Sequence, residues 1–451
     1  MLTLNRQSHE QLYHQLYRQL RAEIETGVRQ PGQVLASTRF LAQQLRVSRN
    51  TVDHAYQDLV AEGYVISKPG AGYHVTQQLP YLTDMNALAQ PATTEKFRYD
   101  FTESYDHLRL FPKQAWRNAE QAMMFTGLPH IQPANGDLQY RRQLVAMLAR
   151  VKGIHATPEQ LVVTSGFNEA AGIIANLLPE LTTDCLGVAN PTAPNARHVW
   201  PRLDVPTVPF TPETAPTTWP AALGYLLTPT HNFPTSYGFT IAERQRLAAW
   251  ARAQERYLIE LDTDGTLDYS GTPAPALAHD YPERTFYYGN YDDTLGSALC
   301  LGFLVIPANL VPIYQAKYSK LPNRNSQWQQ QIVSHLIAND ALERFMRQLT
   351  LVYANRRQIL LGTLKTAFGA ALVPLGAPAG TVVTLRLTTG ERASDVIATA
   401  AQAGVGLVDP DRCWVDRRED YQSLILSFRQ VDDAQIIAGI HAWQSVWQPR
   451  A

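Results

Sequence analysis

The spacing of hydrophobic residues at the start of the chain predicts three helices followed by a hairpin. An aliphatic side chain recurs at every fourth position from residue 12 to residue 24, which places one apolar stripe on a helix that Gly27 would end. Ser37 and Ser48 are suitable N-caps for a second and a third helix. Residues 64–75, YVISKPGAGYHV, are predicted to form two short strands around a turn. This succession is typical of a winged helix-turn-helix domain.

The same periodicity separates the inward from the outward side chains of the second and third helices. We expect the inward side chains to be Phe40, Leu41 and Leu45 in the second helix, and Val52, Ala55, Tyr56 and Leu59 in the third. The third helix then turns these polar residues to solvent: Arg49, Asn50, Thr51, Asp53, His54 and Gln57.

The first turn of this third helix has the chemistry to read DNA. Its free backbone N–H groups can meet phosphate, Arg49 can form a bidentate contact with guanine, and Asn50 or Thr51 can contact bases or phosphate. The alternative is that Arg39 and Arg49 are only solvated helix ends. Residues 1–76 carry eight Lys or Arg against six Asp or Glu. Because this charge is only mildly positive, we expect tight binding to require a dimer.

Beyond residue 76 the pattern changes to alternating short strands and helices. Residues 77–98 have no sustained period and contain two prolines, which predicts a linker. In residues 99–451, runs such as LVVTS, YLLTP and CLGFLVI alternate with helical segments, as in a mainly parallel α/β sheet covered on both faces. This larger part spans about residues 120–310, and about residues 325–451 predict a smaller α+β part.

The composition is that of an ordinary globular protein, with 451 residues, 45% hydrophobic and 18% charged, and a net charge of −1. The sequence contains no run of about 18 apolar residues, so no membrane span is predicted. The N-terminus lacks the apolar h-region of a signal peptide. The three cysteines, Cys185, Cys300 and Cys413, have no metal-like spacing. We therefore expect a cytoplasmic protein without a metal site.

Residues 25–75 carry a run of motifs at fixed spacing: Pro-Gly, Leu-Ala-Ser-x-Arg, Val-Ser-Arg-x-Thr-Val, Ala-Tyr-x-x-Leu, Glu-Gly-Tyr and Gly-x-Gly. The run resembles the GntR family of bacterial regulators, whose pattern has a proline where this chain has Ala36. The resemblance implies DNA contacts by Arg39 and Arg49 and a wing tip, Gly70–Gly72, at a minor groove. The candidate DNA-binding residues are Arg39, Ser48, Arg49, Asn50, Thr51, His54, Lys68, Gly70 and Gly72.

Residues 99–451 contain a second ordered set of landmarks, among them ANGDLQYRRQLVAML, VTSGFNEAAGIIANLL, LTPTHNFPTS and GNYDDTLGSALCLGFLVIP. These landmarks resemble the fold type I aminotransferase domain. Together with the preceding winged helix-turn-helix domain, which we call the reader, they make the chain similar to the MocR subfamily of GntR regulators, end to end. The resemblance implies an α/β fold with an N-terminal winged helix-turn-helix joined to an aminotransferase-like domain. It also implies a head-to-tail homodimer and a domain that binds pyridoxal 5′-phosphate and senses a small amine or the cofactor itself.

The stretch GNYDDTLGSALCL, residues 289–301, corresponds to the family segment that captures this cofactor. A pyridoxal site needs a lysine amine to form the Schiff base. In this comparison Asp293 replaces that lysine, Asp292 replaces a serine and Cys300 replaces an arginine. Two like charges about 4 Å apart cost about 4 kcal/mol at an effective dielectric near 20, so the carboxylates oppose a phosphate dianion in the usual pose.

Other elements of the family's cofactor pattern are also replaced. Leu261 and Thr263 stand where the family has the carboxylate and phenol that hold the ring, and Asp262 is expected to point to the other face of its strand. Ala193 takes the place of the stacking aromatic residue, and Phe167 enters the phosphate loop. The vestigial pocket predicted in this way consists of Gly166, Phe167, Asn168, Ala193, His231, Leu261, Thr263, Asp292, Asp293 and Cys300.

These substitutions predict a DNA-binding regulator that is not an enzyme and holds no Schiff-base cofactor. We expect its partners to be operator DNA, a second copy of the chain and a small-molecule effector. One interpretation of Asp292 and Asp293 is that both are solvated or that one caps the turn. The other is that they favour a cationic or amine ligand, with Glu260 and Asp262 strengthening the field and His231 tuning it with pH.

Three alternatives remain open from the sequence. Another lysine could carry the cofactor, the candidates being Lys113, Lys152, Lys317, Lys320 and Lys365. The chain could be a pyridoxal phosphate-binding MocR regulator with residual aminotransferase-type chemistry, as the family resemblance alone would imply. It could also be a purely structural protein without an effector.

Overall fold

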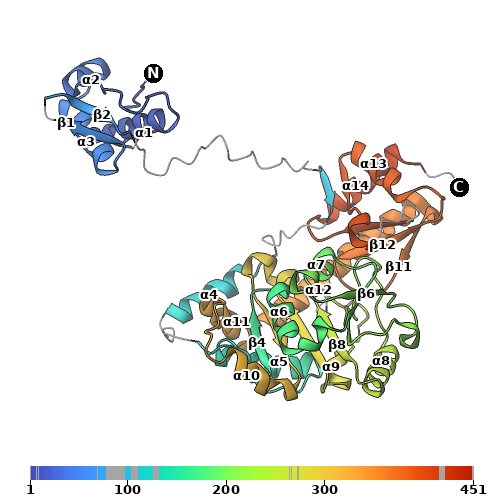
Figure 1. Cartoon of the computed structure of the whole chain (residues 1–451). Helices are drawn as coiled ribbons and strands as arrows, with labels where there is room; N and C mark the ends of the chain where they lie inside the picture. The colour runs from blue at the N-terminus through green and yellow to red at the C-terminus, as the bar shows by residue number, and fades with distance from the viewer. Residues whose placement is uncertain are drawn as a thin grey trace. The chain divides into compact units, whose positions relative to one another are not determined.

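The computed structural model of the chain describes residues 2–6, 8, 10–68, 70–77, 97–102, 110–124, 132–263, 265, 267–271, 274–415 and 422–448. The chain divides into two compact units, Met1–Glu95 and Lys96–Ala451. Of the predicted linker, 77–98, only residues 77, 97 and 98 lie within the described residues. Each unit is described by itself below (Figure 1).

The first unit contains three helices and a two-stranded hairpin in the predicted order. The elements are α1 Leu12–Glu25, α2 Thr38–Leu45, α3 Arg49–Ala61, β1 Val65–Lys68 and β2 Gly72–Val75 (Figure 1). The two strands pair antiparallel. The stripes predicted for the first and third helices are confirmed, because both form the core of this unit, with these residues at most 1% exposed: Leu16, Leu20, Ile24, Val52, Ala55, Tyr56 and Leu59.

Both predicted serine caps are present in the first unit. Ser37 Oγ accepts a hydrogen bond from the backbone N–H of Phe40 at 3.2 Å, and Ser48 Oγ accepts one from the N–H of Thr51 at 3.1 Å. One prediction for the second helix is wrong, since Phe40 is 61% exposed. The helix has only two turns, and its buried face instead consists of Thr38, Leu41 and Ala42.

A seven-stranded sheet forms the centre of the second unit (Figure 1). Its strand order is β4 Leu161–Thr164, β10 Gly302–Val305, β9 Thr285–Asn290, β8 Tyr257–Asp262, β7 Gly224–Leu227, β5 Leu186–Ala189 and β6 Thr207–Phe210. β10 pairs antiparallel with β4 and β9, and the other neighbouring strands are parallel. The mainly parallel sheet predicted from the alternating pattern is confirmed.

Helices cover both faces of this sheet. They are α4 Lys113–Met124, α5 Leu138–Lys152, α6 Phe167–Leu177, α7 Pro194–His198, α8 Ile241–Ala253, α9 Leu277–Asp280, α10 Val311–Tyr318 and α11 Gln327–Ala338. Tyr287 of β9 packs into a core with α5 and α11, whereas its neighbours Phe286 and Tyr288 pack into a second core with α6 and α10. This alternation decides which side chains of β8 and β9 reach each side of the sheet.

The remainder of the second unit has the α+β character predicted for it. Its elements are β3 Tyr99–Phe101, α12 Ala341–Phe368, β11 Leu372–Leu375, β12 Val382–Leu387, α13 Ala393–Gln402, β13 Val405–Leu407, β14 Ser423–Ser427 and α14 Asp433–Val446. β11, β12 and β14 form an antiparallel sheet, and β13 pairs parallel with β3. Among the described residues, no helix combines the length and apolar character needed to cross a bilayer.

Candidate DNA-reading surface and ligand pocket

The start of α3 presents its polar side chains to solvent. Arg49, Asn50 and His54 are exposed, and Thr51 is half-buried. The Arg49 side chain is 70% exposed, and its Nε lies 3.5 Å from Asp53 Oδ2. An ion pair that is this exposed to solvent is weak. The guanidinium can therefore leave Asp53 for a base or a phosphate at little cost in free energy.

Ser48 has a different role from the other candidates on this helix. Its Oγ accepts from the backbone N–H of Thr51 and lies 2.8 Å from Thr51 Oγ1. Both hydroxyls therefore take part in building the first turn of α3. They stabilise the start of the helix, which carries Arg49 and Asn50.

The remaining candidate DNA contacts lie on α2 and the hairpin. Arg39 is exposed in the first turn of α2, and Lys68 is exposed at the end of β1. Gly70 and Gly72 have φ of +78° and +88°, a left-handed backbone that favours glycine. A Cβ on either glycine would meet nothing within 4 Å. Gly70 and Gly72 thus offer bare backbone that a nucleic-acid groove can approach closely.

A cavity of about 330 Å³ lies in the second unit, with loops that follow β4, β5, β7, β8 and β9 in its wall. Ends of parallel strands are the usual place for ligand sites in α/β folds. Nine of the ten predicted pocket residues line it: Gly166, Phe167, Asn168, Ala193, His231, Leu261, Thr263, Asp292 and Asp293. The tenth, Cys300, is not in the wall. It is exposed, has φ of +46°, and donates its Sγ to the Ser297 carbonyl at 3.5 Å.

Asp293 forms a buried ion pair across this cavity. Its Oδ1 accepts from Arg429 Nη2, and the two side chains are only 8% and 10% exposed. Arg429 follows β14 in the smaller part of the unit, and its Nε donates to Thr381 Oγ1 at 3.0 Å. The interpretation that both carboxylates are solvated is therefore wrong. The sequence reasoning missed Arg429, whose only local signal is its position just after a buried strand.

Asp292 faces the same cavity in a different setting. One of its oxygens accepts from Asn290 Nδ2 at 2.9 Å. Burial raises the pKa of the Asp292 carboxyl, and the charge of Arg429 opposes that rise. Arg429 pairs with Asp293, and Asp292 is a half-buried carboxylate in the same wall.

The alternation along β8 directs its acidic residues away from the cavity. Leu261 and Thr263 line the cavity, whereas Asp262 Oδ2 lies 2.6 Å from Lys152 Nζ and accepts from the Tyr287 hydroxyl at 2.5 Å. The predicted orientation of Asp262 is confirmed.

Glu260 is likewise held inside the protein. It accepts from the backbone N–H of Leu277 at 2.8 Å and lies 3.7 Å from Arg244. Burial raises the pKa of Glu260 to about 7. The expectation that Glu260 and Asp262 strengthen the field in the cavity is wrong, because neither is in its wall.

The five lysines considered as substitutes lie elsewhere. Lys152 is buried and paired with Asp262, and Lys317 Nζ donates to the Asn176 carbonyl. Lys113, Lys320 and Lys365 are exposed. None of the five is among the described residues that line the cavity.

Comparisons with known proteins match this two-part architecture. Residues 12–75 match the family of bacterial regulatory proteins of the gntR type. Three curated regulators resemble nearly the whole chain. An uncharacterised helix-turn-helix regulator of Bacillus subtilis, YhdI, is 28% identical over 99% of this chain and 98% of its own length. The probable rhizopine catabolism regulatory protein MocR of Rhizobium meliloti is 26% identical over 99% and 96%.

The third relative is the pyridoxine biosynthesis transcriptional regulator PdxR of Corynebacterium glutamicum, which is 27% identical over 88% of this chain and 87% of its own length. Solved structures resemble the second unit in fold. An archaeal alanine:glyoxylate aminotransferase has a TM-score of 0.68 at 17% identity, covering 77% of this chain and 90% of its own. Kynurenine aminotransferase of Pyrococcus horikoshii also has a TM-score of 0.68, at 18% identity over 81% and 96%. The chain therefore joins a DNA-binding domain that matches the gntR family to a second unit with an aminotransferase-like fold, and nearly its whole length is similar to transcription regulators such as MocR.

Proposed function

We propose that the aminotransferase-like domain of this regulator senses an effector and dimerises the chain without forming a Schiff base to pyridoxal phosphate. On this proposal the protein is not an enzyme. The observation that carries the proposal is the carboxylate of Asp293, ion-paired with Arg429, at the position that resembles the family's cofactor lysine.

The side chains around the cavity do not fit pyridoxal phosphate in its usual pose. A Schiff base requires a neutral amine, and Asp293 offers a carboxylate whose partner is a guanidinium. A protonated pyridine nitrogen requires a carboxylate, and the cavity wall there carries Leu261 and Thr263 while Asp262 pairs with Lys152 on the other face. Among the described residues of the wall there is no lysine, and outside the loop after β8 the carboxylates are those of Glu169, Asp292 and Asp293.

A cationic or amine ligand suits the cavity better than an anionic one. An ammonium group beside Asp292 would gain a charge-assisted hydrogen bond and would restore the ionised form that burial disfavours. The aromatic rings of Phe167 and Phe233 in the same wall can cover the apolar part of such a ligand. His231, which is 2% exposed, also lies in the wall.

Dimerisation is the second task proposed for this domain. One reader with eight basic and six acidic residues has little net attraction for DNA, so two half-sites bound together are needed for tight binding. Light scattering at micromolar concentration should give the mass of a dimer. A monomeric mass would contradict this part of the proposal.

A second candidate function keeps pyridoxal phosphate as the sensed molecule. It is favoured by one observation, the full-length similarity to PdxR, which is named as a pyridoxine biosynthesis regulator. In that case the cofactor would bind by contacts other than the family's lysine linkage. Stabilisation of the protein by pyridoxal phosphate, without an amine response, would select this alternative.

Thermal unfolding of the full chain tests the effector proposal with 1,4-diaminobutane and its neutral analogue 1,4-butanediol. We expect the diamine to raise the unfolding temperature and the diol to leave it unchanged. Asp292→Asn should remove the response, because it removes the carboxylate and keeps the shape of the side chain. Glu213→Gln, at an exposed carboxylate outside the cavity wall, should respond as the wild type does. A response that survives Asp292→Asn, or that the diol reproduces, would contradict the proposed ligand class.

A further inference from the structure

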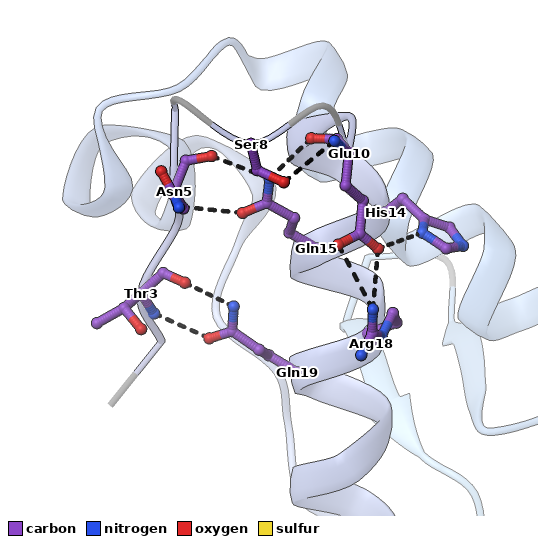
Figure 2. A network of polar contacts seen from close by, with 8 residues as sticks. All are labelled: Thr3, Asn5, Ser8, Glu10, His14, Gln15, Arg18 and Gln19. Carbon is purple, nitrogen blue, oxygen red and sulfur yellow. Dashed lines mark hydrogen bonds and ion pairs between the residues drawn. The ribbon is translucent and has the colours of Figure 1, made fainter.

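The chain before α1 is held along that helix by two glutamine side chains (Figure 2). Gln19 Oε1 accepts from the backbone N–H of Thr3 at 2.9 Å, and its Nε2 donates to the Thr3 carbonyl at 2.6 Å. Gln15 Oε1 accepts from the backbone N–H of Asn5 at 2.9 Å, and its Nε2 donates to the Asn5 carbonyl at 3.0 Å. The same Nε2 also donates to the Glu10 carbonyl at 2.7 Å. Each amide thus pairs with both the backbone N–H and the backbone C=O of one residue, as a neighbouring strand would.

Apolar contacts add to this pairing. Leu2 and Leu4, which alternate with the two residues held by glutamine, pack against the core of the first unit. We call residues 2–6 the amino-terminal arm. Because Gln15 is only 8% exposed, its bonds to the arm are shielded from water and fix the arm in place.

The arm ends at the turn of the helix-turn-helix. Arg6 Nη2 donates to the backbone carbonyl of Arg46 at 2.5 Å. Arg46 terminates α2 in a left-handed conformation, φ +54°, and stands three residues before Arg49. The contact therefore places the Arg6 guanidinium at the entrance to the recognition helix.

Exposed positive charge is concentrated at this place. Arg6, Arg46 and Arg49 are all exposed. Among the described residues, no carboxylate forms an ion pair with Arg6 or Arg46, and Asp53 lies 3.5 Å from Arg49. A guanidinium has five N–H donors, and the bond to the Arg46 carbonyl uses only part of this capacity in Arg6.

We propose that the amino-terminal arm is a DNA-contacting element in addition to α2, α3 and the hairpin, and that Arg6 binds a backbone phosphate beside the recognition helix. The proposal rests on DNA binding by this unit. Arginine pairs with phosphate oxygens in a planar, bidentate geometry, and such contacts set the orientation of a reader without specifying bases. Because the glutamines already order the arm, its binding does not have to overcome the entropy of a flexible tail.

The test uses the full chain, a labelled duplex from the region upstream of its own gene, an unrelated duplex, and a titration of salt. Arg6→Ala should weaken binding to both duplexes several-fold. It should also lower the slope of log K against log salt by about one for each bound protomer, since one phosphate contact contributes about 0.9. Arg6→Lys should keep most of the slope, because a lysine can still neutralise the phosphate.

Two further variants separate the arm's role from a general effect on the fold. Arg18→Ala removes an exposed arginine of α1 that faces Glu10 at 3.2 Å, and it should leave the slope unchanged. Gln19→Ala keeps every charge but frees part of the arm, so it should weaken binding less than Arg6→Ala while its slope stays near that of the wild type. The thermal stability of each variant is measured alongside.

An unchanged slope in Arg6→Ala would overturn the proposal, whether or not affinity falls. If affinity falls only in proportion to a loss of thermal stability, the arm serves the fold alone and the proposal is equally wrong. Absence of salt-dependent binding by the wild type would instead contradict DNA binding by the unit itself.

Discussion

Arg49 at the start of α3 and Asp293 at the cavity both occupy positions on which a family pattern depends, and the structure surrounds them in opposite ways. The Arg49 side chain is 70% exposed and only loosely paired with Asp53, at 3.5 Å. The Asp293 side chain is 8% exposed and ion-paired with Arg429. A surface that binds an external partner keeps its charges accessible, whereas a buried charge must find its partner within the protein. The first unit thus keeps Arg49 available to a partner outside the chain, whereas Asp293 is neutralised within the second unit.

The largest effect is expected from breaking the pair that neutralises the cavity. Arg429→Ala would leave Asp293 buried without its guanidinium and should lower the free energy of unfolding of the second unit by about 3–5 kcal/mol. Denaturant titration followed by circular dichroism measures this loss. Arg252→Ala breaks an exposed pair with Glu283 and should cost about 0–1 kcal/mol. Equal losses in the two variants would show that the cavity pair is no more important than a surface pair.

A second carboxylate held inside the protein extends the comparison to pH. Burial raises the pKa of Glu260 from 4.5 to about 7, so its neutral form is favoured in the folded state. The associated stability is fully present below about pH 4.5 and is lost as pH rises through about 7. Over this interval the wild type should lose about 3 kcal/mol of unfolding free energy that Glu260→Gln does not lose. Parallel stability curves for the two proteins would contradict the raised pKa.

In the reader, a substitution at the recognition helix should change the specificity of DNA binding rather than the stability of the protein. Arg49→Ala removes a bidentate contact to a base, so discrimination between the operator and an unrelated duplex should fall by about 1–3 kcal/mol. Competition binding at fixed salt measures the ratio of the two affinities. Gln57→Ala, on the exposed face of the same helix, is the control. If Arg49→Ala keeps full discrimination, α3 is not the helix that reads bases.

The smallest effect is expected at the hairpin. Lys68 is exposed at the end of β1, and Lys68→Ala should weaken binding to operator and unrelated DNA alike. The slope of log K against log salt should fall by about one, as for the loss of one phosphate contact. A loss confined to the operator would mean that Lys68 reads sequence instead of backbone.

Sequence patterns served the two regions unequally, for physical reasons. In the first unit the apolar stripes, the serine caps and the glycine turn are local features of the sequence. They predicted the three helices and the hairpin, and the one wrong prediction was the burial of Phe40. In the cavity, the residues at the ends of β8 and β9 were predicted because alternation along a strand fixes their side. Arg429 could not be predicted as a cavity residue, because it lies 136 residues from Asp293 in the sequence and only the tertiary fold brings the two together. Cys300 was misplaced because a left-handed turn directs it to solvent.

The central claim is that the cavity forms no Schiff base, and borohydride reduction tests it most directly. The purified full chain is incubated with pyridoxal phosphate, examined for the absorbance band of an internal aldimine, reduced, digested and analysed by mass spectrometry. We predict no such band and no pyridoxyl adduct on any cavity peptide, including the one that contains Asp293. A stoichiometric adduct on a lysine, together with the band, would contradict the account of this domain.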